Sequence, residues 1–262
     1  MTQRSQRPLA LVTGASRGIG RAIATALADT HTVVVTARSE AALASLVAAL
    51  EDAGRGPALP LIADLGTAAG RAALLAALAP IVAARGPVVT LVNNAGIAHS
   101  APIARTDDAA WTSLGELNLR APFELCRALL PAMIEAGSGR VINVASTAAL
   151  KGYRYTAAYA ATKAGLVGMT RALAVEVADK GVTVNAVCPG FTDTDIVADA
   201  VANITAKTGR TSAQAREALA RFSPQGRLRK PDEIAALVVF LASDAAAGIT
   251  GQAIALDGGE TA

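Results

Sequence analysis

The chain has 262 residues, of which 52% are hydrophobic and 17% are charged, enough apolar material to bury a large core and to exclude a disordered protein. Its net charge of +3 is too small for a protein that binds nucleic acid along a basic face. The N-terminus has too short an apolar run for a signal peptide, and the longest apolar run, residues 72–84, is too short to span a bilayer. We therefore expect a soluble, cytoplasmic protein that binds neither nucleic acid nor membrane.

Short apolar runs rich in β-branched residues alternate with helix-length segments along the chain. This alternation predicts a doubly wound α/β fold with a parallel sheet covered by helices on both faces. No linker divides the chain, so we expect a single domain over residues 1–262. Ligands of such sheets bind at the carboxyl ends of the strands. The seven predicted strands lie within residues 9–14, 32–38, 58–65, 88–96, 139–146, 182–190 and 251–259.

The first predicted strand ends in a glycine-rich turn, TGASRGIG, that leads into a helical segment. Backbone amides and a helix N-terminus in such a turn can face a pyrophosphate, and glycine allows the backbone to approach the ligand closely. An ordinary tight turn between a strand and a helix is the alternative. The residues expected to line a dinucleotide here are Thr13, Gly14, Ser16, Arg17, Gly18, Ile19 and Gly20.

The end of the second predicted strand bears on the choice of cofactor. Ala37 and Arg38 stand where an acidic residue would bind the ribose hydroxyls of NAD. Arg38 and Arg17 could instead bind a 2′-phosphate through charge-assisted hydrogen bonds. Both could also be solvated surface arginines. The pattern favours NADP(H), with NAD(H) possible.

Tyr159 and Lys163 are four residues apart in a helical, alanine-rich stretch, so both side chains can point into the same cleft. A nearby ammonium favours the phenolate and is expected to lower the pKa of the phenol, which suits proton exchange with a carbonyl or alcohol oxygen. Ser146, upstream in the sequence, could hydrogen-bond the same oxygen. For so short a pattern, the alternative is a core tyrosine with a lysine that reaches solvent.

Five motifs in this order resemble the short-chain dehydrogenase/reductase family. They are TGASRGIG, NNAG (93–96), INVAS ending at Ser146, YAATK (159–163) and CPG (188–190). The resemblance covers nearly the whole chain and implies a single Rossmann-like domain with a seven-stranded parallel sheet. It also implies hydride transfer between a nicotinamide cofactor and a carbonyl or secondary alcohol, and a homotetramer.

The resemblance further assigns residues to roles. The catalytic set that it implies is Asn118, Ser146, Tyr159 and Lys163. Additional cofactor contacts that it implies are Asp64, Leu65, Asn93, Ala95, Gly96, Tyr159, Lys163, Pro189, Gly190, Thr192 and Thr194. Besides Ser146 and Tyr159, we expect Tyr153 and Tyr155 to border the substrate, although both could merely shield the loop that contains them.

The family places a substrate-covering lobe at residues 191–230, which is here more polar than its surroundings. From Lys207 to Lys230 it holds seven basic residues against one acid, Glu217. A cationic lobe suggests an anionic handle, such as the phosphates of coenzyme A or the surface of an acyl carrier protein; a solvated helix face is the alternative.

The overall pattern resembles the branch that reduces 3-oxoacyl thioesters or oxidises 3-hydroxyacyl-CoA compounds. We therefore expect NADPH-dependent reduction of a 3-oxoacyl group on coenzyme A or a carrier protein. A reductase or dehydrogenase of a free, possibly aromatic, ketone or secondary alcohol is the alternative. A non-catalytic nucleotide-sensing protein is a remote one, because the catalytic set is intact.

The remaining cysteines and histidines do not suggest further chemistry. Cys126 and Cys188 lie in apolar surroundings and are expected to be buried free thiols. His31 and His99 lack cysteines or carboxylates at ligand spacing, so we expect no metal site.

Overall fold

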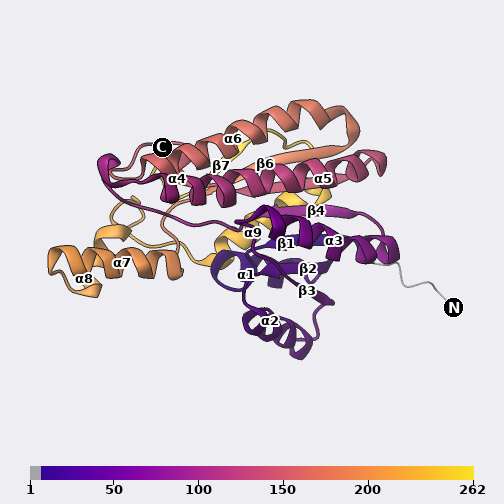
Figure 1. Cartoon of the computed structure of the whole chain (residues 1–262), viewed down its shortest axis with the longest axis horizontal. Helices are drawn as coiled ribbons and strands as arrows, with labels where there is room; N and C mark the ends of the chain where they lie inside the picture. Colours follow the sequence, from indigo (N-terminus) through magenta and orange to yellow (C-terminus); the bar gives the residue numbers. More distant parts are fainter. Residues whose placement is uncertain (1–6) are drawn as a thin grey trace.

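The computed structural model describes residues 7–262 and contains one sheet of seven parallel strands in the order β3-β2-β1-β4-β5-β6-β7 (Figure 1). This confirms the predicted fold. The N-terminal start, for which no signal peptide is expected, lies partly outside the described residues. The strands are β1 (Leu9–Thr13), β2 (Thr32–Ala37), β3 (Ala58–Ile62), β4 (Val88–Asn93), β5 (Gly139–Val144), β6 (Val182–Pro189) and β7 (Ala253–Leu256).

Helices cover both faces of the sheet. One face packs against α1 (Gly18–Leu27), α2 (Glu40–Asp52) and α9 (Pro231–Ala242). The other packs against α3 (Ala68–Arg85), α5 (Ala121–Glu135) and α6 (Ala157–Val177). Strands buried on both sides need near-continuous apolar sequence, which explains why β1, β5 and β6 are buried along their whole length.

The strand order reverses between β1 and β4, because β1 pairs with β2 on one side and with β4 on the other. Chains that leave β1 and β4 therefore diverge and open a crevice at the carboxyl ends of the strands, where ligands of such sheets bind. The glycine-rich turn follows β1 and the NNAG motif follows β4. Both predicted cofactor motifs thus lie where the strand order reverses, at the carboxyl ends of β1 and β4.

The edge of the sheet at β3 has two features that matter for pairing. The strand is five residues long, and Pro60 lies at its centre. Proline has no backbone N–H, so it is tolerated in a strand at a sheet edge.

The segment at residues 191–230 contains α7 (Asp195–Thr208) and α8 (Ser212–Ala220), which lie at one end of the molecule (Figure 1). Val197 and Val201 of α7 pack against Ala215 and Leu219 of α8 in a small apolar cluster of their own. Thr211 begins α8 with a capping box that it forms with Gln214.

By length and composition, α3 is the one described helix that could span a membrane. It extends beyond the apolar run noted in the sequence and contains Pro80. In this fold it lies on the sheet through Leu74 and Leu78, and its first turn carries the buried Arg71. Thr67 caps its start by accepting a hydrogen bond from the Gly70 amide.

Candidate active site

The glycine turn has the backbone geometry that close approach to a phosphate requires. Gly14 and Gly18 have φ of +65° and +52°, in the left-handed region that favours glycine. A Cβ on Gly20 would overlap the carbonyl oxygen of Gly14. No side chain caps the start of α1, so the first amides of this helix remain available to an anion. These residues fit the pyrophosphate of a dinucleotide.

Asn94 joins the glycine turn to the loop after β4. Its Nδ2 donates to the carbonyl oxygens of Thr13 and Gly14, at 2.9 and 3.3 Å, while the Thr13 hydroxyl accepts from the Asn94 and Ala95 amides at 2.9 Å each. The preceding Asn93 points into the core and donates to Asn143 Oδ1 at 2.8 Å. Sequence reasoning singled out Asn93 and missed Asn94, because two adjacent asparagines give no sign of which one faces the turn.

The two arginines expected at the 2′-phosphate lie in different surroundings. Arg38 is exposed at the end of β2 and forms no ion pair within residues 7–262. Arg17 pairs with Asp195 of α7 at 3.0 Å, and both side chains are more than half exposed. The methyl group of Thr194 would lie 3.2 Å from a Cβ on Gly18. The start of α7 therefore lies against the glycine turn, and a carboxylate already holds Arg17.

Ser146, Tyr159 and Lys163 come together at the carboxyl ends of β5 and β6. Ser146 follows β5, and its hydroxyl lies close enough to the Tyr159 phenol to affect the phenol's pKa. Lys163 Nζ donates to the carbonyl oxygen of Val144 at 2.8 Å and lies 6.0 Å from the centre of the Tyr159 ring. The helical spacing thus places the phenol and the amine on one side of α6, as predicted.

The pKa shifts differ from the sequence-based expectation. Burial raises the pKa of the Tyr159 phenol above its ordinary value, and the hydrogen bond from Ser146 offsets only part of this effect. Burial also lowers the pKa of Lys163 to about 8. The expected lowering of the phenol pKa is therefore not present in the protein alone, because desolvation outweighs the opposing hydrogen bond from Ser146. A protonated phenol is the form that can donate a proton to a carbonyl oxygen.

Asn118 lies at the centre of a π-helical segment, Glu116–Arg120, between α4 (Asp108–Gly115) and α5. Its side chain donates to the Ile97 carbonyl and accepts from the Ile97 amide, both at 2.9 Å, and donates to the Thr162 hydroxyl at 3.2 Å. A Cβ on Gly96 would lie 3.0 Å from Asn118 Oδ1 and 3.4 Å from Lys163 Nζ. Asn118 and Lys163 therefore both lie close to Gly96, on the side toward which a side chain would project.

The other predicted cofactor residues lie along the same edge of the sheet. Asp64 is exposed, its Oδ1 accepts from the Gly66 amide at 3.0 Å, and Leu65 beside it is buried. Thr192 donates to the Gly190 carbonyl at 2.9 Å, and Thr194 donates to the Thr192 carbonyl at 3.2 Å. Ser16 and Ile19 are partly buried in the glycine turn, and Pro189 ends β6.

Tyr153 belongs to an aromatic cluster beside the catalytic residues. Its ring centre lies 6.1 Å from that of Phe191 and 5.8 Å from that of Phe222, and those two lie 5.2 Å apart. The Tyr153 hydroxyl contacts Thr147 Oγ1 at 2.8 Å and Glu260 Oε1 at 2.5 Å. Sequence reasoning missed the two phenylalanines and Glu260. The scarcity of aromatics, 3% of the chain, was the available signal, since Phe191 directly follows the CPG motif.

Tyr155 differs from Tyr153 in being exposed. It has φ of +67° and is the one non-glycine residue with positive φ in the described part of the chain, an uncommon conformation for a bulky side chain. Its carbonyl accepts from the Ala101 amide at 2.9 Å, which ties the loop before α6 to the loop after β4.

Three of the seven basic residues counted in the lobe pair with acids. Arg216 pairs with Asp193 at 2.8 Å, Arg221 with Glu217 at 2.6 Å, and Arg227 with Glu233 at 2.7 Å. A fourth arginine, Arg229, is buried and donates to the Arg227 carbonyl. Two of the balancing acids, Asp193 and Glu233, lie outside the window from Lys207 to Lys230, so the count of charges in that window overstated the field. Within the window from Lys207 to Lys230, the exposed basic residues that form no ion pair in the described structure are Lys207, Arg210 and Lys230.

The cysteines agree with expectation and the histidines add no cluster. Cys126 and Cys188 are both free and buried, and burial raises their thiol pKa values to about 12 and about 11. Across residues 7–262 no group of three potential metal ligands occurs. His31 is buried and bonds to Thr30 and Thr90.

Comparison with curated proteins identifies close sequence relatives. The chain is 41% identical over 252 residues to the 3-oxoacyl-[acyl-carrier-protein] reductase FabG of Vibrio cholerae, with 96% of each chain covered. It is 40% identical to the FabG of Escherichia coli over the same length, again covering 96% of each.

Solved structures give the same result for the fold. A variant of the actinorhodin polyketide ketoreductase, crystallised with NADPH, matches with a TM-score of 0.91 and 37% identity over 97% of each chain. YwfH, an NADPH-dependent reductase involved in bacilysin biosynthesis, matches with a TM-score of 0.89 and 27% identity over 97% of this chain and 98% of its own. The family model for short chain dehydrogenases matches residues 8–205. This chain therefore belongs to the short-chain dehydrogenase/reductase family.

Proposed function

We propose that this protein reduces the carbonyl group of a 3-oxoacyl thioester to a hydroxyl group, with hydride from NADPH. As a family member it is an NAD(P)-dependent oxidoreductase that acts on C=O and CH–OH groups. The observation that carries the proposal is the placement of Ser146, Tyr159 and Lys163 at one edge of the sheet, in a chain 41% identical to a 3-oxoacyl reductase over nearly its whole length.

Each catalytic residue then has a distinct task. The cofactor supplies the hydride when it is bound. Tyr159, whose phenol has a raised pKa and favours the protonated form, donates its proton to the carbonyl oxygen. Ser146 donates a hydrogen bond to the same oxygen and stabilises the charge that develops there. Lys163 uses one donor on the Val144 carbonyl, which leaves others for the ribose hydroxyls and the phenol.

Asn118 completes the set by position rather than by contact with substrate. It holds the Ile97 backbone next to Gly96, and Lys163 lies close to the same glycine. In the proposed mechanism Asn118 supports the route by which a proton reaches Lys163 and then Tyr159.

The cofactor is proposed to be NADP(H), with NAD(H) possible. Arg38 is exposed where a 2′-phosphate would lie, and no acid occupies the end of β2. The glycine turn supplies the amides for the pyrophosphate, and Asp64 lies at the edge where the adenine is expected. The structures of two relatives are those of an enzyme with NADPH and an NADPH-dependent reductase.

A second candidate is reduction of a free or polyketide-derived aromatic ketone. The cluster of Tyr153, Phe191 and Phe222 beside Ser146 favours it, because aromatic rings stack against planar ligands. The paired arginines of the lobe also weaken the case for an anionic handle there. In either case residues 191–230 are proposed to cover the substrate.

We also propose a homotetramer located in the cytoplasm. Helices α4, α5 and α6 present a groove lined partly by Trp111, Phe123 and Met169, and the first two are about half exposed. Large exposed apolar side chains on neighbouring helices commonly mark an association surface. Both cysteines are free, which suits a reducing compartment.

The first experiment measures initial rates with acetoacetyl-CoA, an acetoacetate ester and an aromatic ketone, each with NADPH and with NADH. We expect the thioester with NADPH to be reduced fastest. Tyr159→Phe serves as the chemical control, since it removes the proton donor and should lower kcat by about a thousandfold while leaving NADPH binding nearly unchanged. Equal or faster reduction of the ester or the aromatic ketone would favour the second candidate. Substantial residual activity of Tyr159→Phe would contradict the assignment of the proton donor.

A further inference from the structure

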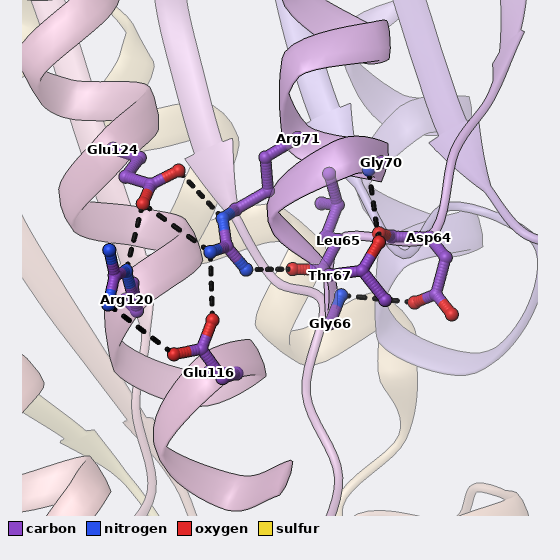
Figure 2. A network of polar contacts seen from close by, with 9 residues as sticks. All are labelled: Asp64, Leu65, Gly66, Thr67, Gly70, Arg71, Glu116, Arg120 and Glu124. Carbon is purple, nitrogen blue, oxygen red and sulfur yellow. Dashed lines mark hydrogen bonds and ion pairs between the residues drawn. The ribbon is translucent and has the colours of Figure 1, made fainter. Parts of the chain in front are cut away.

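Arg71 is a buried charge at the centre of a polar network between α3 and α5 (Figure 2). Its side chain is 1% exposed, and a charged group is rarely buried so completely unless it is paired. Nε donates to Glu124 at 2.7 Å, Nη2 donates to Glu116 at 2.8 Å, and Nη1 donates to the Leu65 carbonyl at 3.0 Å. Every nitrogen of the guanidinium group therefore has a partner.

One of the two carboxylates belongs to the π-helical segment and the other to the helix that follows it. Glu116 is the first residue of that segment and Glu124 lies in the first turn of α5. Arg120, the last residue of the segment, pairs with Glu116 at 3.6 Å and with Glu124 at 2.9 Å on the exposed side. Without a cation between them the two carboxylates would repel each other. Arg71 therefore joins the beginning of the π-helical segment to the helix that follows it.

The pKa of Glu124 reflects its contact with Arg71. The hydrogen bond from Arg71, followed by that from Arg120, lowers the pKa of Glu124 to about 2. The carboxylate is thus charged throughout the neutral range, and the ion pairs persist wherever the enzyme would work.

Asn118 stands in the middle of the segment that Arg71 holds. A π-helical turn carries one residue more than an α-helical turn; such turns are rare and frequently occur at functional sites. If the segment returned to α-helical register, the following residues would rotate by about 100° around the helix axis. Asn118 could then no longer bond both Ile97 and Thr162 as it does now. The geometry of this turn decides whether Asn118 faces Gly96 and Lys163.

The third partner of Arg71 lies on the cofactor side. Leu65 follows Asp64, and the loop is held by the hydrogen bonds from Gly66 to Asp64 and from Gly70 to Thr67. Figure 2 shows this loop on one side of Arg71 and Glu116 and Glu124 on the other. One side chain thus connects the loop after β3 to the segment that carries Asn118.

We propose that Arg71 is a positioning residue that fixes the π-helical segment so that Asn118 faces Lys163, and that links this segment to the Asp64–Leu65 loop. The proposal rests on the proposed function for its kinetic readout. Arg71 touches neither substrate nor the reacting atoms, and it acts through Glu116, Glu124 and the Leu65 backbone.

The test compares Arg71→Met, which removes the charge but keeps much of the volume, with Arg140→Met. Arg140 is also buried, donates to the Gly139 and Gly181 carbonyls and pairs with Asp244. It lies at the opposite end of β5 from Ser146, so its loss removes a comparable network far from the site. Both variants should lower the melting temperature, but only Arg71→Met should lower kcat, by about tenfold or more, since small displacements near a reacting centre are costly.

The pH profile of kcat separates positioning from simple loss of stability. In the wild-type enzyme kcat should fall as the pH rises through about 8, where Lys163 loses its proton. Displacement of Asn118 should move this limb by about half a pH unit or more in Arg71→Met and leave it unchanged in Arg140→Met. Arg71→Lys, which restores a cation between the carboxylates, should recover part of kcat. An unchanged kcat and pH limb in folded Arg71→Met would overturn the proposal.

Two further measurements keep the proposal testable if Arg71→Met does not fold or if the wild-type enzyme reduces none of the substrates above. Glu116→Gln weakens the contacts of Glu116 with Arg71 and Arg120 but leaves those of Arg71 with Glu124 and Leu65 in place. It should give a smaller fall in kcat with the same direction of the pH shift. Crystal structures of the wild-type protein and of this variant report the position of Asn118 without any activity. A variant in which Asn118 keeps its contacts to Ile97 and Thr162 would contradict the positioning role, whereas an inactive wild-type enzyme would contradict only the proposed function.

Discussion

The glycine turn and the lobe at residues 191–230 both face the candidate site, but different kinds of contact fix them. The turn depends on backbone approach: a Cβ on Gly14 would lie 2.8 Å from Ala95 Cα. The lobe depends on a small apolar cluster and on ion pairs between side chains that are about half exposed, such as Arg216 with Asp193. Backbone contacts tolerate almost no substitution, whereas exposed ion pairs can be exchanged at little cost. The cofactor end is therefore constrained by sterics, and the lobe can vary with the substrate.

Among the substitutions that compare these two regions, the largest effect should follow one in the glycine turn. In Gly20→Ala the added methyl group overlaps the Gly14 carbonyl oxygen, which is backbone and cannot move aside. We expect the dissociation constant for NADPH, measured by nicotinamide fluorescence, to rise by about tenfold or more, and the melting temperature to fall. Gly168→Ala in α6 is the matched control, because its Cβ meets no atom within 4 Å and alanine favours a helix. Equal behaviour of the two variants would show that the turn is not sterically constrained.

An intermediate effect should follow the loss of Arg38. Arg38→Ala should raise the KM for NADPH by about tenfold, the cost of losing hydrogen bonds to a charged group, and change the KM for NADH by less than about twofold. Arg17→Ala should have a smaller effect, because Asp195 already holds that guanidinium. If Arg38→Ala raised both KM values equally, Arg38 would be a solvated surface residue and the preference for NADP(H) would need another source.

The smallest effect should follow a substitution in the lobe. Arg221 pairs with Glu217 one helical turn away, and both side chains are mostly exposed. Arg221→Ala should lower the free energy of unfolding by about 0.5 kcal/mol or less and leave the KM for acetoacetyl-CoA nearly unchanged. Lys207→Ala and Arg210→Ala, which remove exposed cations without an ion pair in the described residues, sharpen the comparison. If the KM for acetoacetyl-CoA rose clearly in these two variants alone, the lobe would be shown to bind the phosphates of coenzyme A.

The parts of the molecule that local pattern determines could be predicted from the sequence. Continuous apolar runs marked all seven strands, because strands covered on both faces have no polar side. The spacing of Tyr159 and Lys163 predicted a shared face because a helix repeats every 3.6 residues.

The contacts between distant segments could not be predicted in the same way. Arg71 lies 45 residues from Glu116 and 53 from Glu124, and nothing in a helix of alanines and leucines distinguishes a buried arginine from a solvated one. The charge of the lobe was overestimated for a similar reason. Asp193 and Glu233 pair with its arginines, but both lie outside the window in which the charges were counted. The pKa of Tyr159 depends on how deeply its ring is buried, which only the packing of β5, β6 and α6 reveals.

The short edge strand β3 also affects how the protein behaves when many copies are present together. An open edge of a sheet offers unpaired N–H and C=O groups to which another extended chain can add, and this is a common route to aggregation. In β3 the edge is five residues long and Pro60 removes a donor from its centre. Intermolecular strand addition at this edge is therefore disfavoured, which protects a crowded or newly synthesised population of the enzyme from sheet-to-sheet self-association.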